Sequence, residues 1–460
     1  MQFLSTPLAR HTTSLKSLTS QPVTRFILAG TLFLSFLLLL WSAQSPHHGP
    51  FGRPPPPPPP HGGPPTHYPG SQHGSGLHVG EPSSSELRNW KKPAGMKIIG
   101  LVFYGRREFV EVLDCYLKRN LVRNGGVMDE VVFVVNTKNK TDLDYLDRIV
   151  NGTVGYKKRL TEGKLDGWTE KWELAERGNI YIKIDDDVLF FEDDAIAAIA
   201  KRMVENPHYF AVSANSVNNP ALSWVHYNLG VYEPYLPETS RPGIGQSQQS
   251  GWRASELPEW TGPPLNEFLD ESTWNSTTPS PFPGHRWLPV NNTKLDITDT
   301  PAGQLTYDSH GPGWRDWRIA AQTHYSFLQH LEEDALWRYK FNLWDYQYYR
   351  VSVNFIGFWG DDIVDAYPFP IADDEAYLTM QRPKELGRHV VLDGTVVSLH
   401  FAFSVQRRGP DEEKSPGGGL YHTDLLKRYK AYADEMVCPF PKRGHAIGGG
   451  GGTKGSFWRL

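Results

Sequence analysis

Cysteine is scarce in this sequence, and its scarcity excludes one class of fold. The chain has only Cys115 and Cys438, too few for the disulfide framework of a small secreted domain. The two could form one bridge or remain free thiols, and the sequence leaves both open. An excess of charge of one sign is also lacking, because 47 basic and 51 acidic side chains nearly balance. This balance excludes a general nucleic-acid binder.

Acidic residues are absent before Glu81, and an apolar run, 26–43, lies within that stretch. A helix of this length spans about 27 Å, enough for a thin secretory-pathway bilayer. Three basic residues precede the run, which predicts a cytoplasmic tail over 1–25. A cleaved signal peptide is the alternative, but the run is long for one and starts late. We therefore expect an uncleaved signal anchor and a single-pass type II membrane protein.

Proline and glycine dominate residues 44–94, which include seven consecutive prolines. Proline fits neither a helix interior nor a central strand, so we expect a disordered stem in this stretch. N-glycosylation sequons follow at Asn139, Asn151, Asn275 and Asn291, and they agree with a lumenal location. A tail, an anchor, a stem and a large domain over 95–440 are typical of a Golgi membrane enzyme. Residues 441–460 are expected to form a flexible tail.

Strand and helix patterns alternate from residue 96 onward. Continuous apolar runs predict strands over 96–104, 130–135 and 179–184, and helical spacing predicts helices over 108–122, 141–150, 169–177 and 193–206. Thr141 or Asp142 should cap the second helix. This alternation predicts an α/β fold with a mixed, mostly parallel sheet flanked by helices. Ligands of such sheets bind beyond the carboxyl ends of the strands.

The middle of the domain, 230–312, loses this order and fills with Pro, Gly, Ser and Trp. A loop region of this length usually binds something or is disordered, and we expect it on the acceptor side of the site. Aromatic faces suit the C–H faces of sugars, but we expect any single tryptophan here to be a packing residue. Regular structure resumes over 314–341 as a long amphipathic helix.

Three aspartates, Asp185, Asp186 and Asp187, follow the strand 179–184 directly. Adjacent carboxylates repel, so the cluster needs a metal, hydrogen-bond donors or water. A solvated turn before a helix is the plainest explanation, and the absence of D-x-D-x-D-G argues against a calcium loop. The third possibility is a divalent cation completed by substrate phosphates. Residues 192–194 are expected to cap the next helix.

A second acidic cluster precedes the strand-like run 395–403, which contains His400. The cluster comprises Asp361, Asp362, Asp373, Asp374 and Glu375. A histidine in an apolar strand is more often a hydrogen-bonded core residue, but this one follows two groups of acids. An imidazole nitrogen added to oxygen ligands would favour Mn²⁺ over Mg²⁺.

At these residues the sequence resembles a known family. "YIKIDDDVLF" is similar to the strand-plus-DxD motif of GT-A-fold glycosyltransferases, especially β1,3-glycosyltransferase and Fringe-like enzymes. "ADDEAYLT" is similar to their acidic motif ahead of a helix. The opening "MKIIGLVFYGRREFVEVLDCYLKRN" resembles a group of fungal type II membrane proteins placed with these transferases. The resemblance covers roughly residues 96–406, and the Trp- and Pro-rich middle departs from it.

The resemblance implies a GT-A-like fold and a metal–nucleotide site. Asp187 would ligate the metal, Mn²⁺ or Mg²⁺, and His400 matches the family's final metal ligand. Asp185 would contact the ribose or sugar of the nucleotide-sugar donor. Asp186 would assist either role, which makes it a candidate nucleotide-sugar-binding residue.

Two further pairs of residues receive alternative roles. Arg106 or Arg107 could hold nucleotide phosphate, because guanidinium forks match phosphate geometry; an ordinary surface pair is the alternative. Asp374 or Glu375 would remove the proton of the acceptor hydroxyl in an inverting reaction. Matching the following tyrosine favours Glu375, whereas matching the acids alone favours Asp374.

The function implied is a metal-dependent glycosyltransferase that moves a sugar from a nucleotide sugar to a lumenal glycan or glycoprotein. Two alternatives remain. Acids with histidine also bind the metals of phosphodiesterases and phosphatases, although more histidines near the acids would be expected. A membrane-tethered glycan-binding protein with an inactive transferase fold is the second alternative.

Overall fold

The structure is a computed structural model, and it describes only part of the chain. The described residues are 87, 90–160, 167–242, 251–263, 274–290, 297–304, 311, 313–408 and 418–438. The expected membrane anchor 26–43, nearly all of the stem, the tail 441–460 and Asn291 lie outside them. Among the described residues, none of the helices combines the length and apolarity needed to cross a membrane. The chain divides into two units, 1–76 and 77–460, and all described residues belong to the second.

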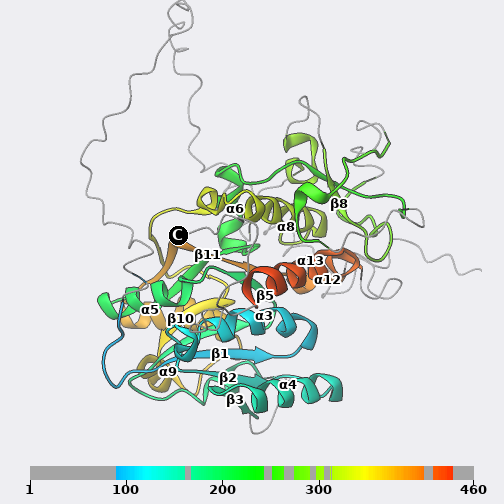
Figure 1. Ribbon diagram of the computed structural model, residues 1–460. Coiled ribbons are helices and arrows are strands. Elements are labelled where there is room, and N and C mark those ends of the chain that lie inside the picture. The colour runs from blue at the N-terminus through cyan, green and yellow to red at the C-terminus, as the bar shows by residue number, and fades with distance from the viewer. Residues whose placement is uncertain are drawn as a thin grey trace, which may run out of the picture. The chain divides into compact units, whose positions relative to one another are not determined.

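A nine-stranded sheet forms the centre of this unit (Figure 1). Its order is β3 (Tyr156–Arg159), β2 (Glu130–Val135), β1 (Ile98–Tyr104), β4 (Ile180–Asp185), β10 (Phe355–Trp359), β6 (Ala211–Val217), β11 (Val390–His400) and β5 (Val188–Phe191), and β9 (Trp344–Gln347) also pairs with β11. The strands β10, β5 and β9 run against their neighbours, whereas the other six share one direction. The sheet is therefore mixed and mostly parallel, as the sequence predicts.

Helices cover both faces of the sheet. They are α3 (Arg107–Arg119), α4 (Lys140–Gly152), α5 (Ala195–Glu205), α6 (Pro220–Asn228), α8 (Trp317–Glu332), α9 (Gly360–Ala366), α10 (Asp374–Ala376), α11 (Arg382–Leu386), α12 (Ser404–Arg408) and α13 (Leu425–Tyr432). Alternate residues of β1 point into two separate apolar clusters, Val102 into one and Phe103 into the other. A strand buried on both faces has to be apolar throughout, which explains the continuous apolar run over 98–104.

Three expectations about helices are wrong in detail. The cap of α4 is Asn139, whose side chain accepts from the amide of Thr141. The helix expected over 169–177 is only a 3₁₀ turn, η3 (Thr169–Trp172). The helix expected over 314–341 ends at Glu332, shortly before Asp334 adopts a positive φ of 54°. It is buried on nearly all sides rather than amphipathic, because other segments cover the faces that its sequence leaves polar.

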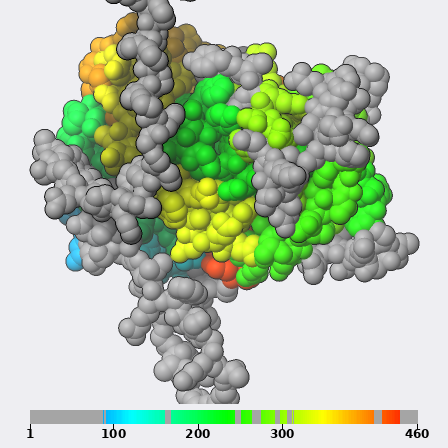
Figure 2. Space-filling view, turned by 90° about the horizontal axis from the view of Figure 1, so that it is seen from above, coloured from blue at the N-terminus to red at the C-terminus, as the bar shows by residue number. Residues whose placement is uncertain are grey.

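The middle region packs against α8 and contributes the short antiparallel pair β7 (Tyr235–Pro237) and β8 (Trp287–Pro289). In the space-filling view, its green and lime residues lie together on one side of the molecule (Figure 2). Trp252, Trp274 and Trp287 are buried. The expectation that individual tryptophans here serve packing is confirmed for these three.

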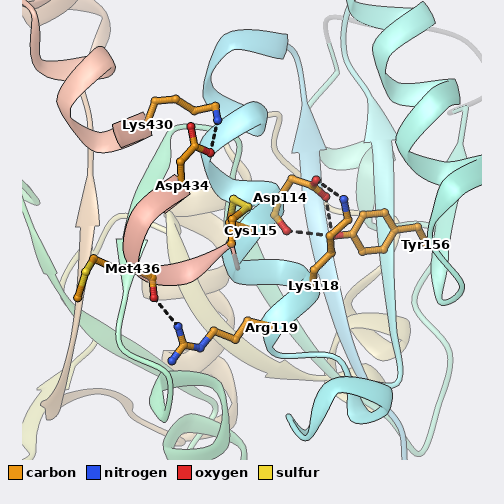
Figure 3. Close-up of a disulfide and its surroundings, with 9 residues drawn as sticks. Asp114, Cys115, Lys118, Arg119, Tyr156, Lys430, Asp434 and Met436 are labelled. Atoms are coloured by element: carbon orange, nitrogen blue, oxygen red, sulfur yellow. Dashed lines mark hydrogen bonds and ion pairs between the residues drawn. A yellow bond between two sulfur atoms is a disulfide. The ribbon is translucent and has the colours of Figure 1, made fainter. Parts of the chain in front are cut away.

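A disulfide joins Cys115 in α3 to Cys438, which follows the π-helix η10 (Ala433–Val437) (Figure 3). The bridge settles the question that the sequence left open. The guanidinium of Arg119 also donates to the carbonyl of Met436 at 3.0 Å. The disulfide and this hydrogen bond fix the C-terminal helices to α3. This helix starts beside Asp186 and Asp187, which contact Arg106.

Removal of this disulfide should destabilise the domain. The two cysteines are 323 residues apart, and closing a long loop restricts the unfolded chain strongly. We expect Cys438→Ser to lower the free energy of unfolding by about 2–5 kcal/mol, measured by urea denaturation. An unchanged midpoint in the variant would show that the bridge contributes nothing to stability.

Buried histidines should make the fold sensitive to acid. Burial lowers the pKa of His226 to about 3 and of His285 and His324 to about 4. They therefore stay neutral in the fold, whereas the unfolded chain takes up protons below pH 6.5. Stability should fall as the pH drops from 6.5 toward 4, with each histidine contributing up to about 1.4 kcal/mol per pH unit. Urea titrations over pH test this, and His226→Gln should flatten the dependence.

Candidate active site

Asp185, Asp187 and His400 meet where the carboxyl ends of β4 and β11 lie close together. Asp185 ends β4, and Asp186 and Asp187 form the turn into β5. The last residue of β11, His400, pairs with Val188 at the start of β5. One ligand atom from each of Asp185, Asp187 and His400 lies within 4.8 Å of the others, and Asp187 Oδ1 is 3.2 Å from His400 Nε2. Strand pairing thus joins an acid and a histidine that are more than 200 residues apart.

Two cations compensate the charge of these acids. Lys183 forms an ion pair with Asp185, and Arg106 Nη2 lies 3.0 Å from Asp187 Oδ2. Burial raises the pKa of the Asp185 carboxyl, and the attraction of Lys183 opposes this only in part. Burial would also raise the pKa of Asp187, but Arg106 and His400 outweigh it and hold that pKa well below its usual range. Asp187 therefore stays ionised.

Asp186 is not part of this trio, although Arg106 Nη2 contacts both Asp186 and Asp187. Its Oδ2 accepts from the amide of Gly105 at 2.9 Å and from Arg106 Nε at 3.2 Å. A Cβ at position 105 would lie 3.3 Å from the same oxygen, so glycine permits the close approach. The side chain of Asp186 thus fixes the turn between β1 and α3.

The two candidate arginines lie in different environments. The guanidinium of Arg106 lies against Asp186 and Asp187, and its Nη1 is buried without a hydrogen-bond partner among the described residues. Arg107 points outward, is 40% exposed, and pairs with Glu111 one turn along α3 at 3.2 Å. Only Arg106 is in contact with the acids of the site.

Asp374 and Glu375 begin the short helix α10 and differ in their contacts. Both Asp374 oxygens accept hydrogen bonds, from Trp172 Nε1 at 2.9 Å and from the amide of Glu375 at 3.0 Å. Glu375 accepts from Arg350 Nε at 2.7 Å and from the amide of Val353 at 3.2 Å. Burial raises the pKa of the Glu375 carboxyl above its ordinary 4.5, with Arg350 opposing.

Glu375 is connected to the trio through the backbone and through Lys183. The residue after Val353, Asn354, accepts the amide of Asp185 through its carbonyl at 2.9 Å. The charge of Lys183 also acts on Glu375. Glu375 therefore lies on the side of the site where Asp185 and Lys183 form their ion pair.

The other acids singled out in the sequence serve other purposes. Asp361 accepts from the amide of Gly178, just ahead of the opposite end of β4, and Asp362 pairs with Arg388. In the 192–194 segment, Asp194 stands before α5 without a side-chain capping hydrogen bond. Glu192 instead accepts from the amide of Val397 at 2.8 Å. Asp194 thus occupies the expected N-cap position of α5, but the segment supplies no side-chain cap, because Glu192 binds β11 and Asp193 pairs with Arg119.

Sequence reasoning missed Lys183 and several aromatic neighbours of the site. Lys183 precedes Asp185 by two positions and so shares its side of the strand, which could have identified it. Phe103 is the β1 partner of Asp185 and stacks with Trp168 at 6.3 Å. Phe403 lies 4.6 Å from the rings of both His400 and Trp314. No local sequence pattern indicated these ring contacts.

The donor set of the trio fits a divalent cation. Two carboxylates and one imidazole nitrogen suit Mn²⁺, and also Mg²⁺ when phosphates and water complete the shell. His400 is buried, and its Nδ1 has no hydrogen-bond partner within the described ranges. In a histidine that ligates a metal, one ring nitrogen ordinarily binds the ion and the other donates a hydrogen bond.

The three sequons that lie within the described residues differ in exposure. Asn139 and Asn151 are exposed at the two ends of α4, whereas Asn275 is partly buried. The first two are therefore open to modification.

Comparison with known proteins gives no family assignment, since no family model and no curated protein matches the chain. Among solved structures, the chain is similar to glucosyl-3-phosphoglycerate synthase from Mycobacterium tuberculosis in complex with Mn²⁺, uridine diphosphate and phosphoglyceric acid. The identity is 16% and the TM-score 0.24, over 34% of this chain and 55% of that one. It is also similar to CMP:2-keto-3-deoxy-manno-octonic acid synthetase complexed with CTP, at 11% identity and TM-score 0.28, over 66% of this chain and 90% of that one.

A third similarity is to 4-diphosphocytidyl-2C-methyl-D-erythritol synthase from Anaerococcus prevotii, at 14% identity and TM-score 0.20, over 26% of this chain and 55% of that one. The chain thus covers about half the length of two of these three proteins. Similarities this partial do not establish an activity, so function has to be inferred from the site itself.

Proposed function

We propose that this protein is a metal-dependent glycosyltransferase that uses a nucleotide-sugar donor. The observation that carries the proposal is the convergence of Asp185, Asp187 and His400 with Arg106 beside them. A divalent cation and a guanidinium side by side suit the two phosphates of a nucleotide sugar. The carboxylate of Glu375 on the Lys183 side then supplies a base for the acceptor.

Each residue of the site has a defined task in this proposal. Asp185, Asp187 and His400 would hold Mn²⁺ or Mg²⁺, which when bound offsets charge on the departing nucleoside diphosphate. Arg106 keeps Asp187 ionised, and its partly exposed guanidinium would attract a phosphate beside the cation. Asp186 keeps Arg106 in place. Arg107 has no role in the proposed chemistry.

Glu375 is the base that we propose for an inverting transfer. It would take the proton of the acceptor hydroxyl as that oxygen attacks the anomeric carbon. A raised pKa makes a carboxylate a better proton acceptor, and burial raises the pKa of Glu375. Both carboxylates accept hydrogen bonds on both oxygens, Asp374 from Trp172 and the Glu375 amide, and Glu375 from Arg350 and Val353. Glu375 is favoured as the base because Lys183, the partner of Asp185, acts on it.

A two-metal hydrolase is less well supported than a transferase. Such enzymes hold two metals in adjacent sites. The only other group of His, Cys, Asp and Glu with metal-ligand spacing in the described ranges is Cys115, Asp434 and Cys438. Its two sulfurs form the disulfide, so it offers no second site.

We further propose that the domain lies in the lumen of the Golgi. Disulfides persist in oxidising compartments, and a bridge joins Cys115 to Cys438. The exposed sequons at Asn139 and Asn151 agree with this location, as does the apolar run 26–43 as a type II anchor.

Calorimetric titration of the detergent-purified full chain tests the proposed function. We expect UDP or GDP to bind in the presence of MnCl₂ and the binding to disappear with EDTA. Nucleotide binding that persists unchanged in EDTA, or that is absent with Mn²⁺, would contradict the proposal.

A further inference from the structure

Four aromatic side chains contact one another in series on and around the edge strand β9. Phe341, Trp344, Tyr346 and Tyr349, here called the aromatic ribbon, contact one another in that order at ring-centroid distances of 6.5, 4.9 and 6.0 Å. Trp344 is 36% and Tyr349 68% exposed. Phe341 and Tyr346 are partly buried and pack against a core cluster, so they hold the two exposed rings in place. Large aromatic side chains are usually buried, so two exposed rings supported in this way indicate a binding surface.

The ribbon ends beside the proposed base. Tyr349 is followed by Arg350, whose Nε lies 2.7 Å from Glu375 Oε1 and whose Nη1 lies 2.8 Å from Asp373 Oδ2. The backbone then continues through Val353, which donates to Glu375. The chain therefore runs directly from the last ring of the ribbon to the residue that pairs with the carboxylate of Glu375.

The chemistry of the ribbon suits a carbohydrate. Aromatic faces accept the apolar C–H faces of sugar rings, and the hydroxyl of the exposed Tyr349 offers a polar group at the same surface. The exposed guanidinium of Arg350 adds donors at the end next to Glu375. Several rings in series provide contacts for more than one sugar unit.

A second copy of the chain is a poorer occupant of this surface. The strand β9 has four residues and ends at Gln347, which has a positive φ of 55°. Its pairing with β11 is also irregular between Val390 and Val391. Short, irregular edge strands are poor templates for pairing with another strand.

We propose that the aromatic ribbon binds an oligosaccharide acceptor whose reactive end lies at Glu375. The inference rests on the proposed function and deepens it, because it assigns the acceptor to extended glycans rather than to single sugars or peptide hydroxyls.

Saturation-transfer NMR with the full chain in detergent tests this inference without requiring turnover. The probes are cellotriose, maltotriose, mannotriose and N,N′,N″-triacetylchitotriose, with the matching methyl monosaccharides and a threonine peptide. We expect at least one trisaccharide to receive saturation on its ring protons and to bind about tenfold more tightly than its monosaccharide. Tyr349→Ala and Trp344→Ala should each weaken that binding about tenfold, the loss of roughly 1.4 kcal/mol.

The matched control is Trp337→Ala, because Trp337 lies in the 3₁₀ helix η7 (Leu336–Tyr339) outside the ribbon and is 71% exposed. This variant should bind the trisaccharide as the unchanged protein does. The inference is overturned if no trisaccharide binds, if the ribbon variants bind normally, or if the threonine peptide binds in their place. It is also overturned if the ribbon variants abolish a concentration-dependent self-association, which would make the ribbon a contact between copies.

Failure of this inference can be told apart from failure of the proposed function. Nucleotide binding with Mn²⁺ is measured separately and does not involve the ribbon. Normal nucleotide binding with no trisaccharide binding would remove the acceptor assignment alone. Trisaccharide binding without any nucleotide binding would leave a glycan-binding surface on a protein that is not the proposed transferase.

Discussion

Replacing Asp187 by asparagine is expected to abolish manganese-dependent nucleotide binding and turnover. Its carboxylate is buried, lies 3.2 Å from His400 Nε2 and 3.0 Å from Arg106 Nη2, and stays ionised. Asparagine keeps the shape but removes the charge that holds a cation. Changes even to groups behind metal ligands cost about 10–100-fold in affinity, so loss of a direct ligand should exceed that. Calorimetry with UDP and MnCl₂, and hydrolysis of a panel of nucleotide sugars, measure the effect.

Asp365→Asn is the matched control for this variant. Asp365 lies in α9, is 52% exposed and pairs only with Arg177 among the ion pairs of the described residues. The Asp365→Asn variant should bind nucleotide and hydrolyse nucleotide sugars as the unchanged protein does. Full activity of Asp187→Asn would show that the acidic motif has no chemical role.

Glu375→Gln should separate catalysis from binding. Glutamine can still accept from Val353 and occupy the same space, but it cannot take a proton. General-base groups contribute about 10²–10⁴-fold to rate, so kcat for transfer should fall by that factor while nucleotide affinity with Mn²⁺ stays within about twofold. Asp374→Asn should have a much smaller effect on kcat, because in the proposal Asp374 takes no proton and only holds Trp172 and the start of α10.

The pH dependence of transfer gives a second readout of Glu375. A base acts only when deprotonated, so the rate should rise with pH through the pKa of this group. Because burial raises that pKa above 4.5, the acid limb of the profile should lie above the ordinary range for glutamate. The residual activity of Glu375→Gln should lack this limb; an unchanged profile would assign the base role to another residue.

The sequence was a good guide wherever the signal was local and periodic. The strands β1, β2 and β4 were predicted within two residues at each end because continuous apolar runs leave few alternatives for a doubly buried strand. The prediction of a 169–177 helix failed because the buried ring of Trp172 and its bond to Asp374 are tertiary features. Such contacts override weak local propensity.

The sequence assigned a metal to Asp187 and His400 and a contact with the ribose or sugar of the donor to Asp185. The fold brings one ligand atom of all three within 4.8 Å of the others, which the sequence order alone does not show. The sequence could not show that Asp186 faces Gly105, or that Arg106 points inward while Arg107 points outward. These orientations depend on the turn after β1, whose backbone geometry no side-chain pattern encodes.

For the aromatic ribbon, the sequence shows the residues but not their exposure. Its residues form a conspicuous group of rings in the sequence between 341 and 349, yet burial cannot be read from composition. Trp252, Trp274 and Trp287 of the middle region are buried, whereas Trp344 and Tyr349 are exposed. Only the placement of β9 at the edge of the sheet distinguishes the two groups.

Pulsed electron paramagnetic resonance of Mn²⁺ bound to the protein tests the central claim most directly, because it reports which nuclei surround the ion. We predict a nitrogen coupling from one imidazole that disappears in His400→Gln, and a phosphorus coupling that appears when UDP is added. A spectrum with no nitrogen coupling, or a nitrogen coupling that survives in His400→Gln, would contradict the assignment of Asp185, Asp187 and His400 as the metal site.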